Sequence, residues 1–377
     1  MPFSGNTYTG PTGSTNAAAG QVVQSAVWNN IHTDLADALT SLRTQNNTQT
    51  PSWANLMAPN GGFNVWQRGT SFSVAASSTA YAADRWCLTT GANEASTVAA
   101  ATGIDDAAAP NAACKATRDA GQTGVTAMTF GYPLDSDEVS RMRGAYVSFE
   151  CMAKAGADWS PASGTLTVEL AVGTGSPAKR GAGFTGETIL FSETADLTAG
   201  GSAATITATS AATVPTNASQ GELQFIWTPV GTAGADDSVT LDGCCLVLGE
   251  IVQSFSEIPF EISLEMCKRH YRKSFPYGTA PAYAAGRTGA VSAFSAAAAR
   301  VSVYVAFSPE LRDTPSVSTF STEATASTWA DLTASVSVTA IAHSSIVAAS
   351  GVLIYTNDSI SAANHFLVVH YDADASI

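Results

Sequence analysis

The sequence predicts a mainly β protein, in which an N-terminal arm and short helix precede two β-sandwich domains joined by a second helix. Two observations predict this fold class. Only 13% of the 377 residues are charged and 45% are hydrophobic, whereas an ordinary soluble domain has about 25% charged residues. Short runs rich in Val, Ile, Thr and aromatic residues recur between turn residues, and such runs are typical of sandwiches.

The first element is an arm followed by an amphipathic helix. Residues 1–20 are rich in Gly, Pro, Thr, Ser and Asn, so we expect them to be extended or ordered only against a partner. The residues Trp28, Ile31, Leu35 and Leu42 recur at spacings of three, four and seven, which places them on one stripe of a helix. This stripe either packs on its own chain or mediates self-association, because so short a seam fits both.

The next part, up to about residue 260, is predicted to be a jelly-roll-like β-sandwich. A polar, Pro-bearing stretch over residues 43–62 is typical of a linker. Eight short β-type runs then follow without helical periodicity between them. The runs are FNVW, TSFSV, GAYVSFECMA, TLTVELAVG, ETILFSET, ATITATSAATV, ELQFIW and DSVTLDGCCLVLG.

A connecting helix and a second β unit complete the chain. Phe260, Leu264, Cys267 and Tyr271 fall at helical spacing, which predicts one apolar helix face. Six further β-type runs lie between residue 290 and the last residues. We therefore expect three parts, which are an assembly segment at 1–50, a sandwich at 51–260, and the helix with a C-terminal β domain at 261–377.

Composition and motifs exclude several kinds of function. The formal net charge of −14 opposes binding to a nucleic-acid backbone, and no apolar window is long enough to insert into a membrane. The six cysteines form no CxxC pair, so we expect small buried thiols rather than a zinc site or disulfide framework. No nucleophile elbow, Walker loop or HExxH motif occurs, and no GxGxxG motif follows a predicted strand. We therefore predict no catalytic residue, no metal and no cofactor.

The aromatic residues are the remaining candidates for a binding site. Those in regular strand or motif positions should pack inside, and they are Trp66, Trp86 and Trp227. Those among turn residues should be exposed, and they are Trp159, Tyr277, Tyr283 and Trp329. Because β-sandwich modules that bind carbohydrate do so through flat aromatic faces with a few polar groups, these four are the candidate glycan-contact residues.

Several blocks resemble the proteins of bacteriophage tails, particularly tail fibre or receptor-binding subunits. NGGFNVWQRGTSFS (60–73) followed by YAADRW (81–86) resembles the opening of a β domain in that family. Further blocks similar to the family, in the same order, are SFSEIPFEISLEMCKRHYRKSF (254–275), VAFSPELRDTPSVS (305–318) and the closing HYDADASI. PTGSTNAAAGQVVQSAVWNNIHTDLADALTSL (11–42) resembles the N-terminal segment of phage tail proteins. Together the blocks frame nearly the whole chain.

Two residues depart from the family pattern. Glu257 stands where a basic and aromatic pair is usual, and His270 replaces the first Tyr of the usual pair. The motif residues make sense as architecture. We expect Asp84 and Arg85 to pair beside the following Trp, with Arg68 capping nearby carbonyls.

The resemblance implies a virion structural protein, made in the cytoplasm of the bacterial host and located in the phage tail or another external appendage. It implies a homotrimer that attaches to other tail or virion proteins through residues 1–50 and presents its β domains to host cell-surface polysaccharide. The alternative is a purely structural baseplate, collar or head-decoration protein without receptor binding. A polysaccharide depolymerase is a third hypothesis, which requires a carboxylate pair in a cleft with one raised pKa.

Overall fold

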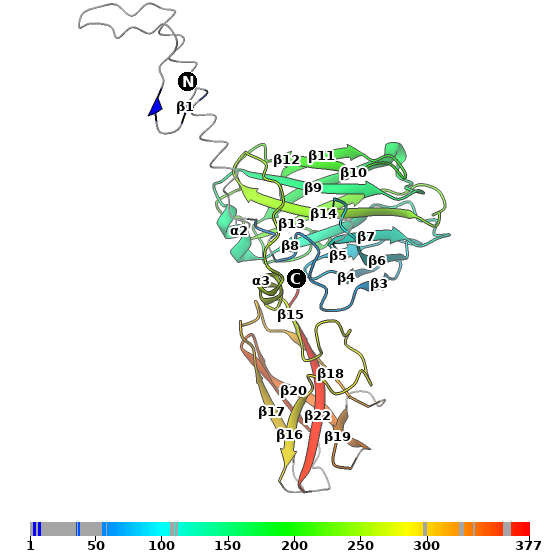
Figure 1. Cartoon of the computed structure of the whole chain (residues 1–377), viewed down its shortest axis with the longest axis vertical. Coiled ribbons are helices and arrows are strands. Elements are labelled where there is room, and N and C mark those ends of the chain that lie inside the picture. Colours follow the sequence, from blue (N-terminus) through cyan, green and yellow to red (C-terminus); the bar gives the residue numbers. More distant parts are fainter. Residues whose placement is uncertain are drawn as a thin grey trace, which may run out of the picture. The chain divides into compact units, whose positions relative to one another are not determined.

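The computed structural model in Figure 1 describes most of the chain after residue 54. The described residues are 3–4, 7–8, 35, 37, 55–57, 59–105, 109, 112–296, 300–323, 328–334, 336–356 and 363–377. The chain divides into two compact units, Met1–Pro51 and Ser52–Ile377.

Little of the first unit is described. Strands β1 (Phe3–Ser4) and β2 (Thr7–Tyr8) form an antiparallel pair. Leu35 is helical and 53% exposed. The other residues of the predicted apolar stripe lie outside the described residues, and they are Trp28, Ile31 and Leu42. The helix and its role in assembly therefore stay predictions.

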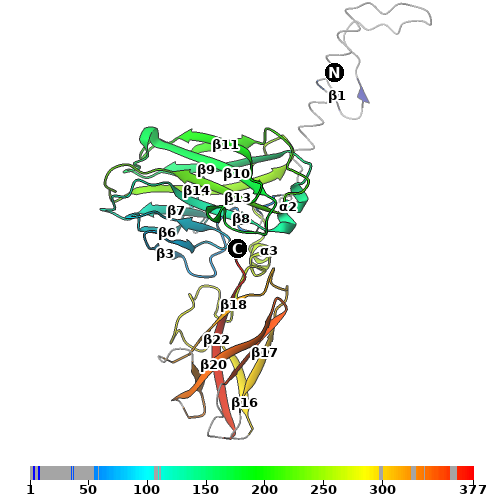
Figure 2. The ribbon, with the colours of Figure 1, turned by 180° about the vertical axis from the view of Figure 1, so that it is seen from behind.

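The first part of the second unit is a sandwich of two six-stranded sheets (Figures 1 and 2). One sheet has the order β11 (Thr188–Asp196), β10 (Thr165–Gly173), β13 (Gln220–Trp227), β8 (Met128–Leu134), β5 (Cys87–Thr89), β4 (Thr79–Tyr81). The other has the order β12 (Ala204–Thr209), β9 (Val147–Ala155), β14 (Asp237–Leu248), β7 (Ala113–Arg118), β6 (Ser96–Ala101), β3 (Ser71–Val74). Short helices α2 (Ser136–Met142), η2 (Ala162–Gly164) and η3 (Arg180–Ala182) lie in the connections. The predicted mainly β fold is thus confirmed.

Alternating residues of the two sheets meet in one aromatic core. In β9, for example, every second residue from Val147 to Ala155 is buried, as expected for a strand with one face on the core. The indole of Trp86 stacks on Phe130, with ring centroids 5.1 Å apart. Trp66, Trp86 and Trp227 are all buried, which confirms their predicted place in the core.

Several strands of the sandwich escaped prediction. Strands β6 (STVAAA) and β7 (ACKATR) are rich in Ala, which has weak β propensity, so neighbouring strands rather than local sequence specify them. The opposite error affects the FNVW run, which is not a strand. Its first residue, Phe63, has a φ of 54°, a left-handed conformation that interrupts an extended chain.

The predicted linker over residues 43–62 is wrong in its second half. Met57 and Asn60 are fully buried. The side chain of Asn55 donates to Cys244 O (3.0 Å) and accepts from Leu246 N (2.9 Å). The Asn60 amide bonds to Val65 and to the carbonyl of Asp84. Asn side chains that satisfy backbone groups explain how a polar segment packs against the sandwich.

The remaining elements form a β unit with its own hydrophobic core. Helix α3 (Phe260–Cys267) leads into β15 (Tyr271–Lys273), β16 (Val291–Ser295), β17 (Ser302–Ala306), β18 (Ser316–Phe320), β19 (Thr328–Asp331), β20 (Val336–Ala348), β21 (Gly351–Thr356) and β22 (His365–Asp374). The sheet order is β15-β22-β19-β20-β21-β17, and β16 and β18 also pair with β22. The last strand, β22, therefore organises this unit.

The connecting helix is shorter than its apolar spacing predicts. Tyr271 belongs to β15 and pairs with Asp374 of β22. The buried face of α3 contains Ser263 and Cys267, while Ile262 and Met266 are exposed. Pairing with the C-terminal strand thus overrides the continued helical spacing, as tertiary contacts often override local propensity.

All six cysteines are free and buried. Burial raises the pKa of Cys114 and of Cys267, so these thiols are protonated hydrophobic groups. Among the described helices, none has the length and apolarity to cross a membrane.

Candidate functional site

The sequence blocks that stand out most are brought together at one buried junction. Gln67 bonds to the carboxylate of Asp84 and donates to Tyr271 O at 3.0 Å. The guanidinium of Arg68 lies 2.8 Å from the carboxylate of Asp374 and 3.8 Å from the ring centroid of Tyr271. Residues more than 200 positions apart in sequence therefore join the sandwich to the C-terminal β unit. Their role here is structural.

Arg85 is the centre of this junction, and its predicted pairing with Asp84 is wrong. Its guanidinium makes two hydrogen bonds to Glu138, at 2.9 and 2.8 Å. It also donates to Pro133 O, at 2.8 Å. Arg85 and Asp84 are adjacent in sequence, and each side chain reaches a different partner, since Asp84 bonds to Gln67. Arg68 likewise pairs with a carboxylate rather than capping carbonyls.

His270 also belongs to this hydrogen-bond network and contacts Arg85. Its Nε2 lies 2.9 Å from Nη1 of Arg85, and because a guanidinium only donates, Nε2 must be the acceptor. Burial, together with the charge of Arg85, holds the pKa of His270 well below its usual range. His270 therefore supplies a neutral hydrogen-bond acceptor to a buried cation.

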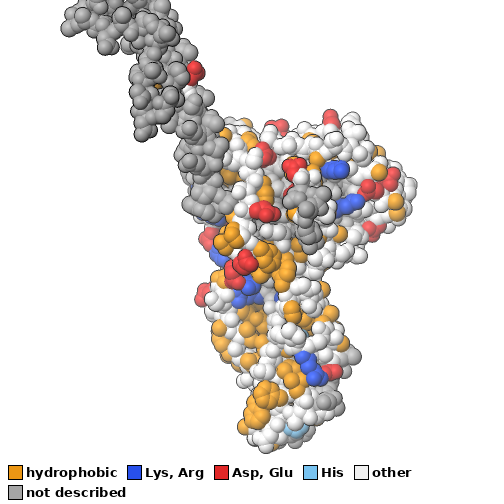
Figure 3. All heavy atoms as spheres, in the orientation of Figure 1, with side chains coloured by type: hydrophobic (Ala, Val, Ile, Leu, Met, Phe, Trp, Pro, Cys, Tyr) orange, Lys and Arg blue, Asp and Glu red, His pale blue; other side chains and the backbone are white. Residues whose placement is uncertain are grey.

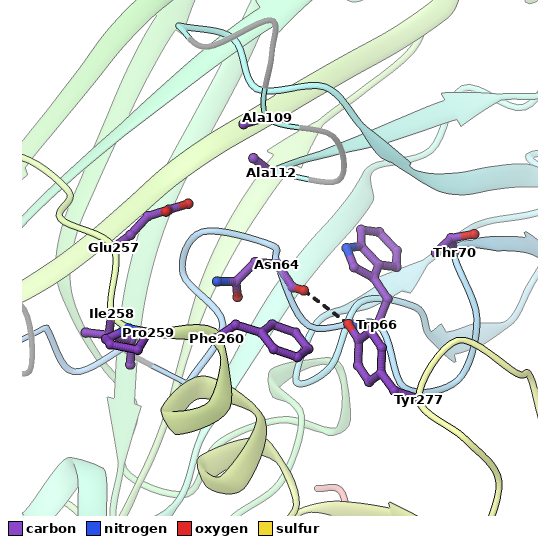
Figure 4. A pocket seen from close by; sticks show the side chains of 10 residues that line it. All are labelled: Asn64, Trp66, Thr70, Ala109, Ala112, Glu257, Ile258, Pro259, Phe260 and Tyr277. Atoms are coloured by element: carbon purple, nitrogen blue, oxygen red, sulfur yellow. Dashed lines mark hydrogen bonds between the residues drawn. The ribbon is translucent and has the colours of Figure 1, made fainter.

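Beside the junction lies a hollow of about 650 Å³, shown in Figure 4. Its lining residues come from the segment before β3, the segment around residue 110, the start of α3 and the loop after β15. They are Asn64, Trp66, Thr70, Ala109, Ala112, Glu257, Ile258, Pro259, Phe260 and Tyr277. In Figure 4 the aromatic rings lie along one side of the hollow, and the two Ala residues lie on the other.

The aromatic side of this hollow is rigidly held. Phe260 and Tyr277 are half-buried and pack edge to face, with ring centroids 5.0 Å apart. The Tyr277 hydroxyl donates to Asn64 O (3.1 Å) and accepts from Trp66 N (2.8 Å). Lys273 donates to Tyr277 O at 2.8 Å. The two half-exposed rings are thus fixed before any ligand arrives, which lowers the entropic cost of binding.

A second hollow of about 530 Å³ adjoins the first over the outer face of the β12-β9-β14 sheet. The two hollows share Ala109, Ala112 and Glu257, so together they form one groove, called here the sandwich groove. The second hollow adds Asp105, Glu150 and Asp242 to the carboxylates that line it.

Asp242 is a partly buried carboxylate of the sandwich groove. Its Oδ2 accepts a hydrogen bond from Ile104 N at 2.6 Å. Burial, with the negative charges of Asp105 and Glu257, nevertheless raises the pKa of Asp242. In the part of the chain that the structure describes, no three acidic, His or Cys groups could hold one metal ion. The carboxylates thus form an acidic lining in which Asp105 and Glu257 lie close enough to Asp242 to act on its charge.

The predicted glycan-contact residues do not form one surface. Trp159 is only 6% exposed, packs beside Trp227 and donates its indole N–H to Gly164 O at 2.9 Å. Trp329 is 0% exposed, because it lies in strand β19 rather than in a turn. The predicted exposure of these two residues is wrong.

The two tyrosines do lie at the surface, in different settings. Tyr283 is 44% exposed and contacts Phe320, with ring centroids 5.5 Å apart. Tyr277 lines the sandwich groove. Sequence reasoning missed the groove's other contributors, such as Phe260, which was expected on a helix face. A signal that could have marked the groove is the position of Asp105 in a run of two adjacent Asp residues.

Comparisons with known proteins give no family. No family model and no curated protein matches the chain. Among solved structures, tailspike protein 4 of bacteriophage CBA120 matches at 10% identity and a TM-score of 0.32, over 53% of this chain and 22% of the tailspike chain.

Carbohydrate-binding modules are also among the similar structures. One from the β-sandwich superfamily matches at 10% identity and a TM-score of 0.31, over 44% of this chain and 57% of its own. A family 22 xylan-binding domain matches at 12% identity and a TM-score of 0.27, over 45% and 89% of the two chains. The chain thus spans well under two thirds of the first two structures. At such TM-scores these likenesses carry no functional argument.

Proposed function

We propose that this chain is a bacteriophage virion structural protein, a tail fibre or spike subunit, that binds host cell-surface polysaccharide through the sandwich groove. Its N-terminal segment attaches it to other virion proteins, and three copies associate. The order of the sequence blocks that resemble phage tail proteins supports the virion assignment. Leu35 is helical and exposed, which supports association of the predicted apolar stripe with other copies of the chain.

The single observation that carries glycan binding is the construction of the sandwich groove. Phe260 and Tyr277 present fixed, half-exposed rings beside the side-chain amide of Asn64 and the carboxylate of Glu257. Ligand sites combine apolar walls with a few placed polar groups in this way. A sugar ring has apolar C–H faces and polar hydroxyl edges, so it can use both kinds of group at once.

The experiment is titration of the full chain with oligosaccharides prepared from the host envelope polysaccharide. Phe260→Ala removes one wall of the groove and is expected to weaken binding about fivefold, since aromatic contacts contribute roughly 1 kcal/mol. Tyr283→Ala is the matched control, because it removes an exposed ring that does not line the groove. Equal binding by wild type and Phe260→Ala would place the glycan site elsewhere. No binding by any variant would favour the purely structural role.

Association is tested separately from binding. Sedimentation of the full chain is expected to give the mass of a trimer, and Leu35→Asp is expected to dissociate it because a charge in an apolar seam is costly. A monomeric wild-type chain would refute the trimer while leaving glycan binding untouched.

A polysaccharide depolymerase is a second candidate, favoured by one specific observation. Asp242 has a raised pKa and lies in the groove with Glu257 and Asp105. Retaining a proton suits a general acid, which protonates the glycosidic oxygen while a second carboxylate activates water. Release of new reducing ends from purified polysaccharide, lost in Asp242→Asn, would establish turnover. Binding without such release supports the primary proposal.

A further inference from the structure

The sandwich groove carries negative charge that no side chain in its lining neutralises. Four carboxylates line it, from Asp105, Glu150, Asp242 and Glu257, and no Lys or Arg is among the described lining residues. On the same sheet, Lys115 is paired with Asp236 at 2.7 Å, and the exposed Lys154 of β9 lies outside the lining of both hollows. The groove therefore has a negative potential that its own lining does not cancel.

The position of each carboxylate shows that this charge faces the groove. Glu150 of β9 and Asp242 of β14 lie on the sheet face opposite the core, because the residues beside them in their strands point inward. Glu257 lies in the segment that precedes α3 and lines both hollows. Burial raises the pKa of Asp242, and the negative charges of Asp105 and Glu257 act in the same direction. A ligand that brings positive charge would relieve this repulsion.

The size of the sandwich groove suits a ligand larger than a single ion, since its two hollows measure about 650 and 530 Å³. Within the described residues, the acidic groups do not converge in a set of three that could ligate one metal. One hollow contains the two fixed aromatic rings and Glu257, and the adjoining hollow contains all four carboxylates. A chain with repeated hydrogen-bond donors matches this arrangement, and charge-assisted N–H···O bonds are about twice as strong as neutral ones.

From this geometry we propose that the sandwich groove takes a glycan that carries free amino groups and excludes acidic polysaccharides. The inference rests on the proposed function, because it names the class of glycan that the same groove binds. Half-exposed Phe260 and Tyr277 contact the apolar face of a sugar ring, and protonated amines along the chain bond to the carboxylates. Uronic or sialic acid units would meet Asp242 and Glu257 with like charge and be repelled.

The test compares three probes against the full chain by calorimetric titration in slightly acidic buffer. They are a glucosamine oligomer, its N-acetylated counterpart and a uronic acid oligomer of the same length. The first two share a backbone and differ in charge. We expect the glucosamine oligomer to bind at least about fivefold more tightly than the N-acetylated one, which corresponds to about 1 kcal/mol, the upper end for one exposed ion pair. We expect no measurable binding of the uronic acid oligomer.

Charge-matched variants separate the groove from general attraction to an acidic protein. Asp242→Asn and Glu257→Gln each raise the net charge by one, and each is expected to reduce the preference for the amine several-fold. Glu193→Gln makes the same change in net charge on exposed β11 of the opposite sheet and is expected to leave the preference unchanged. High salt should also reduce the preference.

The outcomes distinguish this inference from the proposed function. Equal binding of the aminated and acetylated oligomers, or binding of the uronic acid oligomer, overturns the inference and leaves glycan binding standing. An equal loss in Glu193→Gln and Asp242→Asn also overturns it, because the attraction would then be general. If neither these oligomers nor oligosaccharides from the host envelope bind, the proposed function itself fails.

Discussion

Replacing Arg85 by Met should destabilise the second unit more than the loss of any surface ion pair. The guanidinium is buried, with side-chain exposures of 3% for Arg85 and 7% for Glu138. It donates to both oxygens of Glu138, to a backbone carbonyl and to the His270 ring. The Met side chain fills similar space and makes none of these bonds.

The size of the effect follows from the charge left behind. In Arg85→Met, Glu138 would remain buried opposite a thioether, keeping mainly its bond from Asp135 N at 2.9 Å. Removing one partner of a buried pair costs about 3–5 kcal/mol. Replacing both partners, in Arg85→Met with Glu138→Leu, removes the uncompensated charge and should recover part of that loss.

Urea denaturation followed by Trp fluorescence measures the effect, since Trp86 lies in the sandwich core. Arg287→Met is the control, because the Arg287–Glu323 pair at 2.8 Å has side-chain exposures of 50% and 35% and should contribute less than about 1 kcal/mol. If Arg85→Met lowers the free energy of unfolding no more than Arg287→Met does, the buried network does not stabilise the junction as described.

Three further predictions concern pH, packing and thiols. Because the folded pKa of His270 lies well below 6.5, only the unfolded state takes up its proton. Stability should therefore fall as pH drops below about 6.5, by up to roughly 1.4 kcal/mol per pH unit, and His270→Gln should flatten this dependence in acid denaturation curves. A Cβ at Gly61 would lie 2.2 Å from Cys244 O, whereas one at Gly181 would meet nothing within 4 Å. Gly61→Ala should thus lower the free energy of unfolding by about 1–3 kcal/mol, and an equal effect of Gly181→Ala would contradict this. The buried thiols should react with an alkylating reagent only after denaturation, and fast labelling of the native protein, read by mass spectrometry, would be inconsistent with their burial.

The fold class was predictable because hydrophobic, β-branched runs between turn residues specify a sandwich. The strand β14, with its long run of apolar residues, is one of these. What local sequence could not specify were elements stabilised from a distance. Ala-rich β7 is held by pairing with β14 and β6, and buried Asn60 replaces missing backbone partners.

The candidate site was harder to predict than the fold for the same physical reason. Turn-like composition around Trp329 suggested exposure, but strand pairing buried the indole. The groove combines Asn64, Asp242 and Phe260 from three distant segments. Nothing in the local sequence of any one segment indicates that the other two lie beside it. Tyr277 alone was both predicted as a contact residue and found in the groove.

Adsorption of the labelled full chain to intact host cells, and to cells stripped of surface polysaccharide, tests the central claim most directly. The account predicts that wild type and Tyr283→Ala adsorb to intact cells, that Phe260→Ala adsorbs weakly, and that stripping abolishes adsorption. Undiminished adsorption to stripped cells, or by Phe260→Ala, would contradict recognition of polysaccharide through the sandwich groove.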